Sequence, residues 1–226
     1  METLNPLELF DNLSTFDVVQ RALDYLAPSG VQAAICPIAS VLNGHSLMGV
    51  EKTIAVSFGS NRRQEFAAGR SAAREALRLC GCETTAIPRE RRGNPVWPEG
   101  FTGSISHCNG IAVAVAVPTF IHSNIGIDIA RKDSVDPKLA HMIRSPEDSP
   151  DVDITLLFSI KESGFKCVYS KVGKIIDFVE ATVELDERRQ RFTIHPSDPK
   201  ECYFPRVEGS FALAKSYWCT FANRVE

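Results

Sequence analysis

The sequence predicts an α+β fold in which two halves, each with a long helix and a group of strands, pack against each other. Three observations favour it: two long segments with helical spacing of apolar residues, a hairpin signal between them, and short alternating runs near the C-terminal end. Each helix must bury its apolar face on a sheet. Ligand sites are common in crevices between packed units, so we expect a ligand between the two halves.

The chain opens with a predicted helix over 13–26, where apolar residues recur at three- and four-residue steps up to Pro28-Ser29-Gly30. Residues 31–40 and 52–58 are typical of strands. Both element types therefore precede the longest helix of this half.

We predict that this helix starts at Asn61, which can cap it while Gln64 stands three residues on, as in a capping box. Gly81 ends its apolar face. The opposite face is basic, with Arg62, Arg63, Arg70 and Arg74.

A loop rich in proline and glycine is expected over 87–103. Two strands over 104–107 and 111–117 meet at Asn109-Gly110, a strong hairpin signal. Residues 125–129, IGIDI, predict a short buried strand.

The second half continues with a polar loop at Asp148-Ser149-Pro150 and a long helix over about 153–169. Alternating runs between 175 and 222 predict an antiparallel sheet. We place the two subdomains at 1–120 and 121–226.

Charge and composition exclude several classes of protein. A formal net charge of -3 argues against a nucleic-acid binder, and no apolar run is long enough to cross a membrane. No secretory signal is visible, and the seven scattered cysteines form no CxxC pair, so we expect reduced thiols in a cytoplasmic protein. The arginine-rich stretch over 62–92 could bind a small polyanion, although a solvated helix face with a basic loop is the simpler interpretation.

Three separate segments carry residues suited to chemistry. His107 ends a strand beside a turn, where it can donate a hydrogen bond to a phosphate or serve as an ordinary structural residue. Asp128 follows an apolar strand and can bind Mg²⁺ or cap a turn. Glu162 and Lys166 share a helix face; an exposed ion pair is the simpler interpretation, but apolar neighbours and Gly164 argue against full exposure.

Together these residues suit phosphoryl transfer, which needs positioning and charge neutralisation rather than a covalent intermediate. Another magnesium-dependent nucleotide phosphotransferase is an alternative, but the chain has no GxxxxGK[ST] loop. A structural α+β protein is the second alternative.

Four segments in this order resemble the Sfp-type 4'-phosphopantetheinyl transferases, and most nearly their siderophore-pathway branch, the enterobactin synthetase component D group. They are RRQEFAAGRSAAREAL (62–77), GNPVWPEGFTGSISH (93–107), IGIDI (125–129) and FSIKESGFKCVY (158–169), about half of the chain. The resemblance implies a pseudo-twofold monomer with coenzyme A between its halves. It also implies transfer of phosphopantetheine to a serine of an apo acyl or peptidyl carrier protein.

The resemblance assigns roles to individual residues. Asp128 and Glu162 are implied as Mg²⁺ ligands, and Glu162, Lys166 and His107 as catalytic residues. The residues implied in coenzyme A binding are polar or basic: Arg62, Arg70, Arg92, Ser106, His107 and Lys166. It places nucleotide contacts in 1–120 and the metal and catalytic helix in 121–226.

One position departs from the pattern. Many members of the family carry an acid two residues after the metal-binding aspartate, and here that residue is Ala130. Water is expected to complete the magnesium shell. The departure also leaves open a non-catalytic module that binds coenzyme A or a carrier protein.

Overall fold

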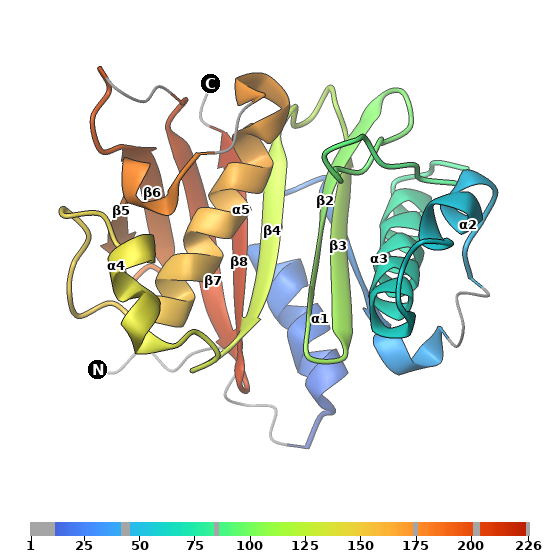
Figure 1. Cartoon of the computed structure of the whole chain (residues 1–226), viewed down its shortest axis with the longest axis horizontal. Coiled ribbons are helices and arrows are strands. Elements are labelled where there is room, and N and C mark those ends of the chain that lie inside the picture. The colour runs from blue at the N-terminus through green and yellow to red at the C-terminus, as the bar shows by residue number, and fades with distance from the viewer. Residues whose placement is uncertain (1–11, 42–45, 84–85, 174–175, 201–203, 225–226) are drawn as a thin grey trace.

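The computed structural model describes residues 12–41, 46–83, 86–173, 176–200 and 204–224. It confirms the predicted α+β class (Figure 1). The strands form two antiparallel sheets, one of three strands in the order β1-β3-β2 and one of five in the order β4-β8-β7-β6-β5.

The first half ends with the three-stranded sheet and the second half begins with β4. The first half consists of α1 (Thr15–Leu26), β1 (Gln32–Pro37), the 3-10 helix η1 (Ile38–Ser40), α2 (Val50–Ala55), α3 (Ser60–Leu79), β2 (Phe101–Cys108) and β3 (Ile111–Pro118). The second half consists of β4 (Ile125–Arg131), η3 (Pro137–Leu139), α4 (Ala140–Ile143), α5 (Ile154–Val172), η4 (Phe178–Glu180), β5 (Ala181–Asp186), β6 (Arg191–Pro196), β7 (Val207–Ala214) and β8 (Tyr217–Arg224).

The two halves share one topology. In the first, β1 precedes α3 and the β2–β3 hairpin, and β1 pairs antiparallel with β3. In the second, β4 precedes α5 and, after the β5–β6 hairpin, the β7–β8 hairpin, and β4 pairs antiparallel with β8. The strand orders β1-β3-β2 and β4-β8-β7 are therefore equivalent, in agreement with the predicted pseudo-twofold arrangement.

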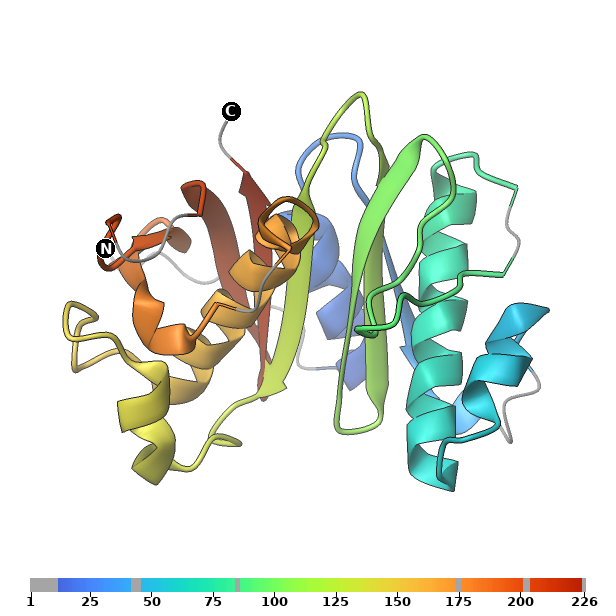
Figure 2. The same ribbon diagram turned by 45° about the horizontal axis from the view of Figure 1, so that its top comes forward.

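Strand β3 separates two parts of the core. It is buried on both faces, and its sequence IAVAVAV alternates large and small residues. Its isoleucine and valines pack with α1 and the second sheet, whereas its alanines pack with α3. Because alanine is small, α3 can lie close to the sheet, and α1 lies between the two sheets (Figures 1 and 2).

The hairpin between β2 and β3 confirms the Asn109-Gly110 signal. Both residues have positive φ, 44° for Asn109 and 86° for Gly110, as a type I′ turn requires. The tight turn fixes the register in which His107 pairs with Ala112. It thereby fixes the end of β2 on which His107 stands.

The predicted strand over 52–58 is wrong, because this segment begins in helix α2. The reason is tertiary: Glu51, in the first turn of α2, is fully buried and accepts hydrogen bonds from Arg74 Nη1 at 2.7 and 2.8 Å. It also accepts one from the Ile87 amide at 2.7 Å. An ion pair with a partner 23 residues away overrides the local alternation of apolar residues.

The predicted capping box at Asn61 is also wrong. Helix α3 begins at Ser60, after Gly59, and no side chain caps it. The predicted end is correct, since Gly81 has a φ of 79° just past the last turn. Strand β2 starts at Phe101, three residues inside the predicted loop over 87–103.

Two further predictions concern the whole chain. No helix within the described ranges has the length and apolar character needed to span a membrane. All six cysteines among these residues are free thiols, and Cys202 lies outside them. Burial raises the pKa of both Cys167 and Cys219 to about 12, so these two thiols stay protonated at neutral pH.

Helix α5 lies very close to β4 at Gly126. A Cβ atom added there would overlap the carbonyl oxygen of Ser163 and would lie 2.8 Å from the amide nitrogen of Cys167. The absence of a side chain at Gly126 therefore sets the distance between the helix and the strand.

We expect Gly126→Ala to lower the free energy of unfolding by about 1–3 kcal/mol, because the added methyl group must push α5 from β4. Urea unfolding measures the change. Gly59→Ala is the matched control, since a Cβ there meets no atom within 4 Å. Equal stabilities for the two variants would show that the contact between α5 and β4 is not tight.

Candidate functional site

The two sheets meet where β2 runs beside β4, and side chains rather than a backbone ladder join these strands. Alternate side chains of β2 accept hydrogen bonds from alternate amides of β4, as the two-residue repeat of a strand allows. The bonds run from Ile127 N to Ser104 Oγ (3.1 Å), from Ile129 N to Ser106 Oγ (3.4 Å) and from Arg131 N to Cys108 Sγ (3.3 Å). The two halves are thereby held in one register.

A cavity of about 1020 Å³ lies between the halves, and a hollow of about 370 Å³ adjoins it. The cavity reaches the upper end of the roughly 300–1,000 Å³ common for ligand sites. Its lining includes basic and aromatic side chains: Arg62, Arg70, Arg91, Arg92 and Lys166 are basic, and Trp97, Phe165, Tyr169 and Phe178 are aromatic. His107, Glu162 and Lys166 line both spaces.

Asp128 is the buried centre of the smaller hollow. Its Oδ1 accepts hydrogen bonds at 2.7 Å from both Ser106 Oγ and Lys166 Nζ, and its Oδ2 accepts one at 2.9 Å from Ser159 Oγ. Ser159 in turn contacts Thr220 Oγ1 at 3.0 Å. Four elements, β2, β4, α5 and β8, therefore fix the orientation of this carboxylate.

Glu162 and Lys166 project from one face of α5 toward Asp128. Lys166 Nζ lies 2.7 Å from Asp128 Oδ1 and 3.9 Å from Glu162 Oε2, and it also donates to Ile127 O at 3.2 Å. Burial raises the pKa of Glu162; Lys166 opposes this shift and Asp128 adds to it. A carboxylate with a raised pKa is a better proton acceptor when ionised.

His107 faces α3 across the same entrance. Its Nε2 lies 2.8 Å from Arg62 Nη1, which can only donate, so Nε2 is the acceptor and the ring is neutral in this contact. Burial is the main cause that lowers the pKa of His107; Glu65 opposes the shift and Arg62 reinforces it. The Arg62 side chain is 53% exposed, so its guanidinium remains open to a ligand.

Arg70 lines the cavity but is largely occupied by the protein. Its Nε donates to Ile87 O at 2.8 Å and its Nη2 to Pro88 O at 3.3 Å, while the guanidinium stacks 4.4 Å from the Phe66 ring centroid. Burial lowers its pKa to about 10. Arg70 therefore holds the start of the cavity-lining loop in addition to facing the cavity.

Arg92 connects the two halves across the cavity. It lies in that loop, and its Nη1 donates to Gly173 O at 2.5 Å, at the C-terminal end of α5. Its side chain is exposed, so this contact can open to admit a ligand.

The acidic residues of the site suit a magnesium ion with few protein ligands. Asp128 and Glu162 face the same ammonium group, so both carboxylates reach one position for a cation. Ala130 lines the smaller hollow on the same face of β4 as Asp128 and carries no ligand. Within the described part of the chain, no three His, Cys, Asp or Glu side chains cluster for a metal. The protein thus offers two carboxylates, which Mg²⁺ can supplement with water and phosphate oxygens.

Several residues of the site escaped the sequence reasoning. Ser159 and Thr220 orient Asp128, and Ser104 joins the halves, yet none of them was singled out. The alternating serines of β2 are a visible pattern for Ser104 and Ser106. Ser159 and Thr220, 61 residues apart, have no local signal.

Comparison with known proteins identifies two family matches along the chain. Residues 51–117 match the family described as the 4'-phosphopantetheinyl transferase N-terminal domain, and residues 124–222 match the 4'-phosphopantetheinyl transferase superfamily. These two matches cover most of both halves and meet near the junction between β3 and β4.

Three relatives illustrate the similarity. The chain is 34% identical over 154 residues to enterobactin synthase component D of Escherichia coli, covering 61% of this chain and 72% of the relative. It is 34% identical over 143 residues to the 4'-phosphopantetheinyl transferase Svp of Streptomyces mobaraensis, covering 58% of each chain. It is 28% identical over 136 residues to the 4'-phosphopantetheinyl transferase PptT of Mycobacterium tuberculosis, covering 56% of this chain and 60% of the relative. The similar region thus spans less than two thirds of the latter two relatives.

The lowered pKa of His107 predicts a pH-dependent stability. Between the folded pKa and the ordinary value of about 6.5, the unfolded chain binds more protons at this ring than the folded protein does. Stability from this group is therefore present above that window and is lost as the pH falls through it. We expect His107→Gln, which keeps an acceptor for Arg62, to show a smaller loss of Tm between about pH 7.5 and about pH 5.5 than the unmodified protein.

The same substitution at His141, an exposed residue of α4, controls for the removal of a histidine. If His107→Gln and His141→Gln follow identical pH profiles, burial of His107 has no effect on proton binding.

Proposed function

This chain belongs to the 4'-phosphopantetheinyl transferase superfamily, and from that premise we propose that it transfers the 4'-phosphopantetheine arm of coenzyme A to a serine hydroxyl of an apo acyl or peptidyl carrier protein. Adenosine 3',5'-bisphosphate is the second product. One observation carries the proposal: Asp128, Glu162 and Lys166 converge where the smaller hollow opens into the cavity between the halves. Acids and a cation at the mouth of a large basic cavity suit the pyrophosphate of such a donor.

The cavity supports coenzyme A as the donor. Its arginines offer partners for the phosphates of the nucleotide, and its aromatic wall offers a surface for the apolar arm. On this proposal Arg62, Arg70, Arg92, Ser106 and His107 bind the donor. Of these, Ser106 acts mainly through Asp128, since its hydroxyl donates to that carboxylate.

Glu162 is the proposed general base. A serine hydroxyl is a weak nucleophile until a base accepts its proton, and Glu162 is the acid of the site that is not already bound by several donors. It takes the proton as the serine oxygen attacks the β-phosphorus of coenzyme A. The bond from this phosphorus to the bridging oxygen breaks, and the adenosine bisphosphate leaves with that oxygen.

Lys166 and His107 are proposed to stabilise the phosphate charges. Lys166 Nζ lies near both carboxylates, so a pyrophosphate bound beside them would be within its reach. A lysine there stabilises or protonates the leaving phosphate. His107, neutral with Nε2 as an acceptor, is left with Nδ1 as a donor to a phosphate oxygen.

Mg²⁺ is the proposed cofactor, held by Asp128 and Glu162. When bound, it would neutralise phosphate charge and polarise the reacting phosphoryl group. The protein's own contribution is to hold Asp128 in a fixed orientation, through the hydrogen bonds from Ser106 and Ser159, and to place Glu162 on the facing helix α5.

The two halves are proposed to have different roles in binding and catalysis. Residues 1–120 supply most contacts with the nucleotide, and residues 121–226 supply the acids and the catalytic helix. We propose that the protein acts as a monomer in the cytoplasm, since both halves of the site come from one chain. The names of two groups of relatives, which include enterobactin synthase component D, support a role in siderophore or other secondary-metabolite synthesis.

A non-catalytic module that binds coenzyme A or a carrier protein is the second candidate. Ala130 favours it, because the site has two carboxylates where many family members have three. Tight binding of coenzyme A without turnover would distinguish this candidate.

Intact mass spectrometry tests the proposal directly. We expect a panel of apo carrier proteins, incubated with this protein, coenzyme A and Mg²⁺, to include at least one that gains a single phosphopantetheine group. No gain on any carrier, with coenzyme A bound, would refute transfer and leave the binding module.

Asp128→Asn and Glu162→Gln are the matched variants for this experiment. Each removes one charge with little change in shape, so we expect folding to persist and transfer to fall by at least about 10²-fold. Near-normal turnover in either variant at modest Mg²⁺ would show that the removed carboxylate neither binds the metal nor accepts the proton.

The two arginines of α3 should behave differently from each other. We expect Arg62→Ala to raise the KM for coenzyme A more than it lowers kcat, because an exposed guanidinium binds ground and transition states alike. Arg70→Ala should raise the KM and also lower the Tm, because it removes bonds to Ile87 and Pro88. Steady-state kinetics and thermal melts measure both effects.

Dephospho-coenzyme A is the control donor for this pair, because it lacks the 3'-phosphate. It should be less sensitive than coenzyme A to at least one of the two substitutions. Equal sensitivity of both donors to both variants would exclude a contact with the 3'-phosphate.

A further inference from the structure

Lys161 is a lysine with no exposed surface in the middle of α5. Its side chain is 0% exposed, and it stands first among the largest fully buried side chains of the described residues. Burying an ammonium group costs free energy unless its donors are all bonded. A lysine retained at such a place therefore needs partners, and it precedes the proposed base, Glu162.

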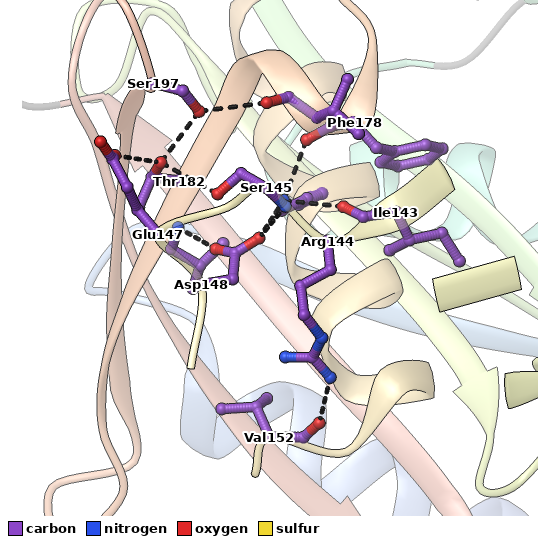
Figure 3. A network of polar contacts seen from close by, with 12 residues as sticks. Ile143, Arg144, Ser145, Glu147, Asp148, Val152, Phe178, Thr182 and Ser197 are labelled. Atoms are coloured by element: carbon purple, nitrogen blue, oxygen red, sulfur yellow. Dashed lines mark hydrogen bonds and ion pairs between the residues drawn. The ribbon is translucent and has the colours of Figure 1, made fainter. Parts of the chain in front are cut away.

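The three donors of Lys161 are bound by three separate segments. Nζ donates to Ile143 O at 2.8 Å, to Asp148 Oδ2 at 2.5 Å and to Phe178 O at 2.9 Å. Figure 3 shows these three oxygens directed toward one nitrogen. The acceptors belong to the end of α4, to the loop before α5 and to η4 after it, so one group holds both flanks of the helix.

Asp148 extends this attachment to the second sheet. Its Oδ1 accepts from the Val183 amide of β5 and its Oδ2 from the Ser145 amide, both at 2.7 Å. Thr182, next in the strand, contacts Ser145 Oγ at 3.1 Å. Both oxygens of the Asp148 carboxylate therefore accept hydrogen bonds, and the Lys161–Asp148 pair joins α5, the loop that precedes it and β5.

The attachment reaches the cavity through Phe178. Its ring lies 5.3 Å from the ring centroid of Phe158 and 5.4 Å from that of Phe165, and both Phe165 and Phe178 line the cavity. Lys161 donates to the backbone carbonyl of Phe178 from the same face of α5 that carries Phe158 and Phe165. Loss of the Lys161 ammonium would leave the Phe178 carbonyl without its donor, and the segments before and after α5 would no longer be held against the helix that carries Glu162.

We propose that Lys161 is a positioning residue of the transfer reaction, which fixes the aromatic wall of the donor cavity and the orientation of Glu162. The proposal rests on the proposed function for its kinetic consequences. Lys161 does not reach the reacting atoms, because its ammonium is enclosed by Ile143, Asp148 and Phe178.

A purely stabilising ion pair is the competing explanation. Buried ion pairs are weak stabilisers compared with apolar residues of the same size, so stability alone gives little reason for one here. The two backbone carbonyls make the difference: an apolar replacement would leave Ile143 O and Phe178 O without the donor that holds them. The explanations separate when stability and the site are measured on the same variant.

The test compares Lys161→Met with Leu23→Ala, which creates a cavity in the core on α1 and lines neither pocket. Both should be destabilised, and both are assayed where they remain folded. We expect Lys161→Met to raise the Kd for coenzyme A about tenfold and to lower kcat by about 10- to 100-fold, as loss of alignment does. Leu23→Ala should change either quantity by no more than about twofold. Equal changes in the two variants would overturn the proposal.

Two additions keep the result decisive. If Lys161→Met does not fold, Lys161→Arg replaces it. A planar guanidinium cannot reproduce three hydrogen bonds that diverge from one nitrogen, so we still expect a several-fold rise in the Kd for coenzyme A. An unchanged Kd overturns the proposal. Calorimetric Kd values need no turnover. A wild-type protein that binds coenzyme A but modifies no carrier would refute the proposed function, while the Kd comparison still decides the role of Lys161.

Discussion

The row of side-chain hydrogen bonds between β2 and β4 is the constraint on which the site depends. Ser104, Ser106 and Cys108 accept bonds from β4 amides that a neighbouring strand would otherwise bind, so the two sheets join without becoming one ladder. This junction places Ser106 against Asp128 and His107 beside the cavity. Gly126, in the same strand, lets α5 come close enough for Lys166 to reach Asp128. The small polar side chains of β2 and the glycine of β4 thus bring functional groups of β2, β4 and α5 together.

Features set by local chemistry could be predicted from the sequence. The helices α1, α3 and α5, the Asn109-Gly110 turn and the stop at Gly81 follow from periodicity and from backbone preference, and all are present. The errors arose where a distant partner decides. The apolar residues at 54, 56 and 58 alternate like a strand, but the buried pair of Glu51 with Arg74 stabilises helix α2 at the start of this segment instead. The local sequence around Glu51 does not show that Arg74 lies beside it in the folded protein.

The same limit applies to the site. The residues named from the sequence line either the cavity or the adjoining hollow, because the fold brings β2, β4, α3 and α5 together. Their state could not be predicted: Arg70 is bound to two backbone carbonyls, whereas Arg62 remains exposed, although both lie on one helix and look alike in sequence. Lys161 is the extreme case. It stands beside Glu162 in the quoted motif, yet its meaning appears only with its three acceptors on segments before and after the helix.

The charge balance of the two-carboxylate site predicts that the metal ion and the donor bind cooperatively. Asp128 is paired with Lys166, so one of the two negative charges of the site, that of Asp128, is already compensated within the protein. A third carboxylate at position 130 would strengthen the attraction for a metal ion, but the residue there is an alanine that is only 5% exposed. On the proposed function, the phosphates of the donor would attract both Lys166 and the metal, and they would supply oxygens that the protein lacks. Each of the two ligands then favours the binding of the other, and the coupling free energy is the same in both directions. A site that is weak for either ligand alone can therefore be strong for the pair, which confines metal-assisted chemistry to the protein with its donor bound.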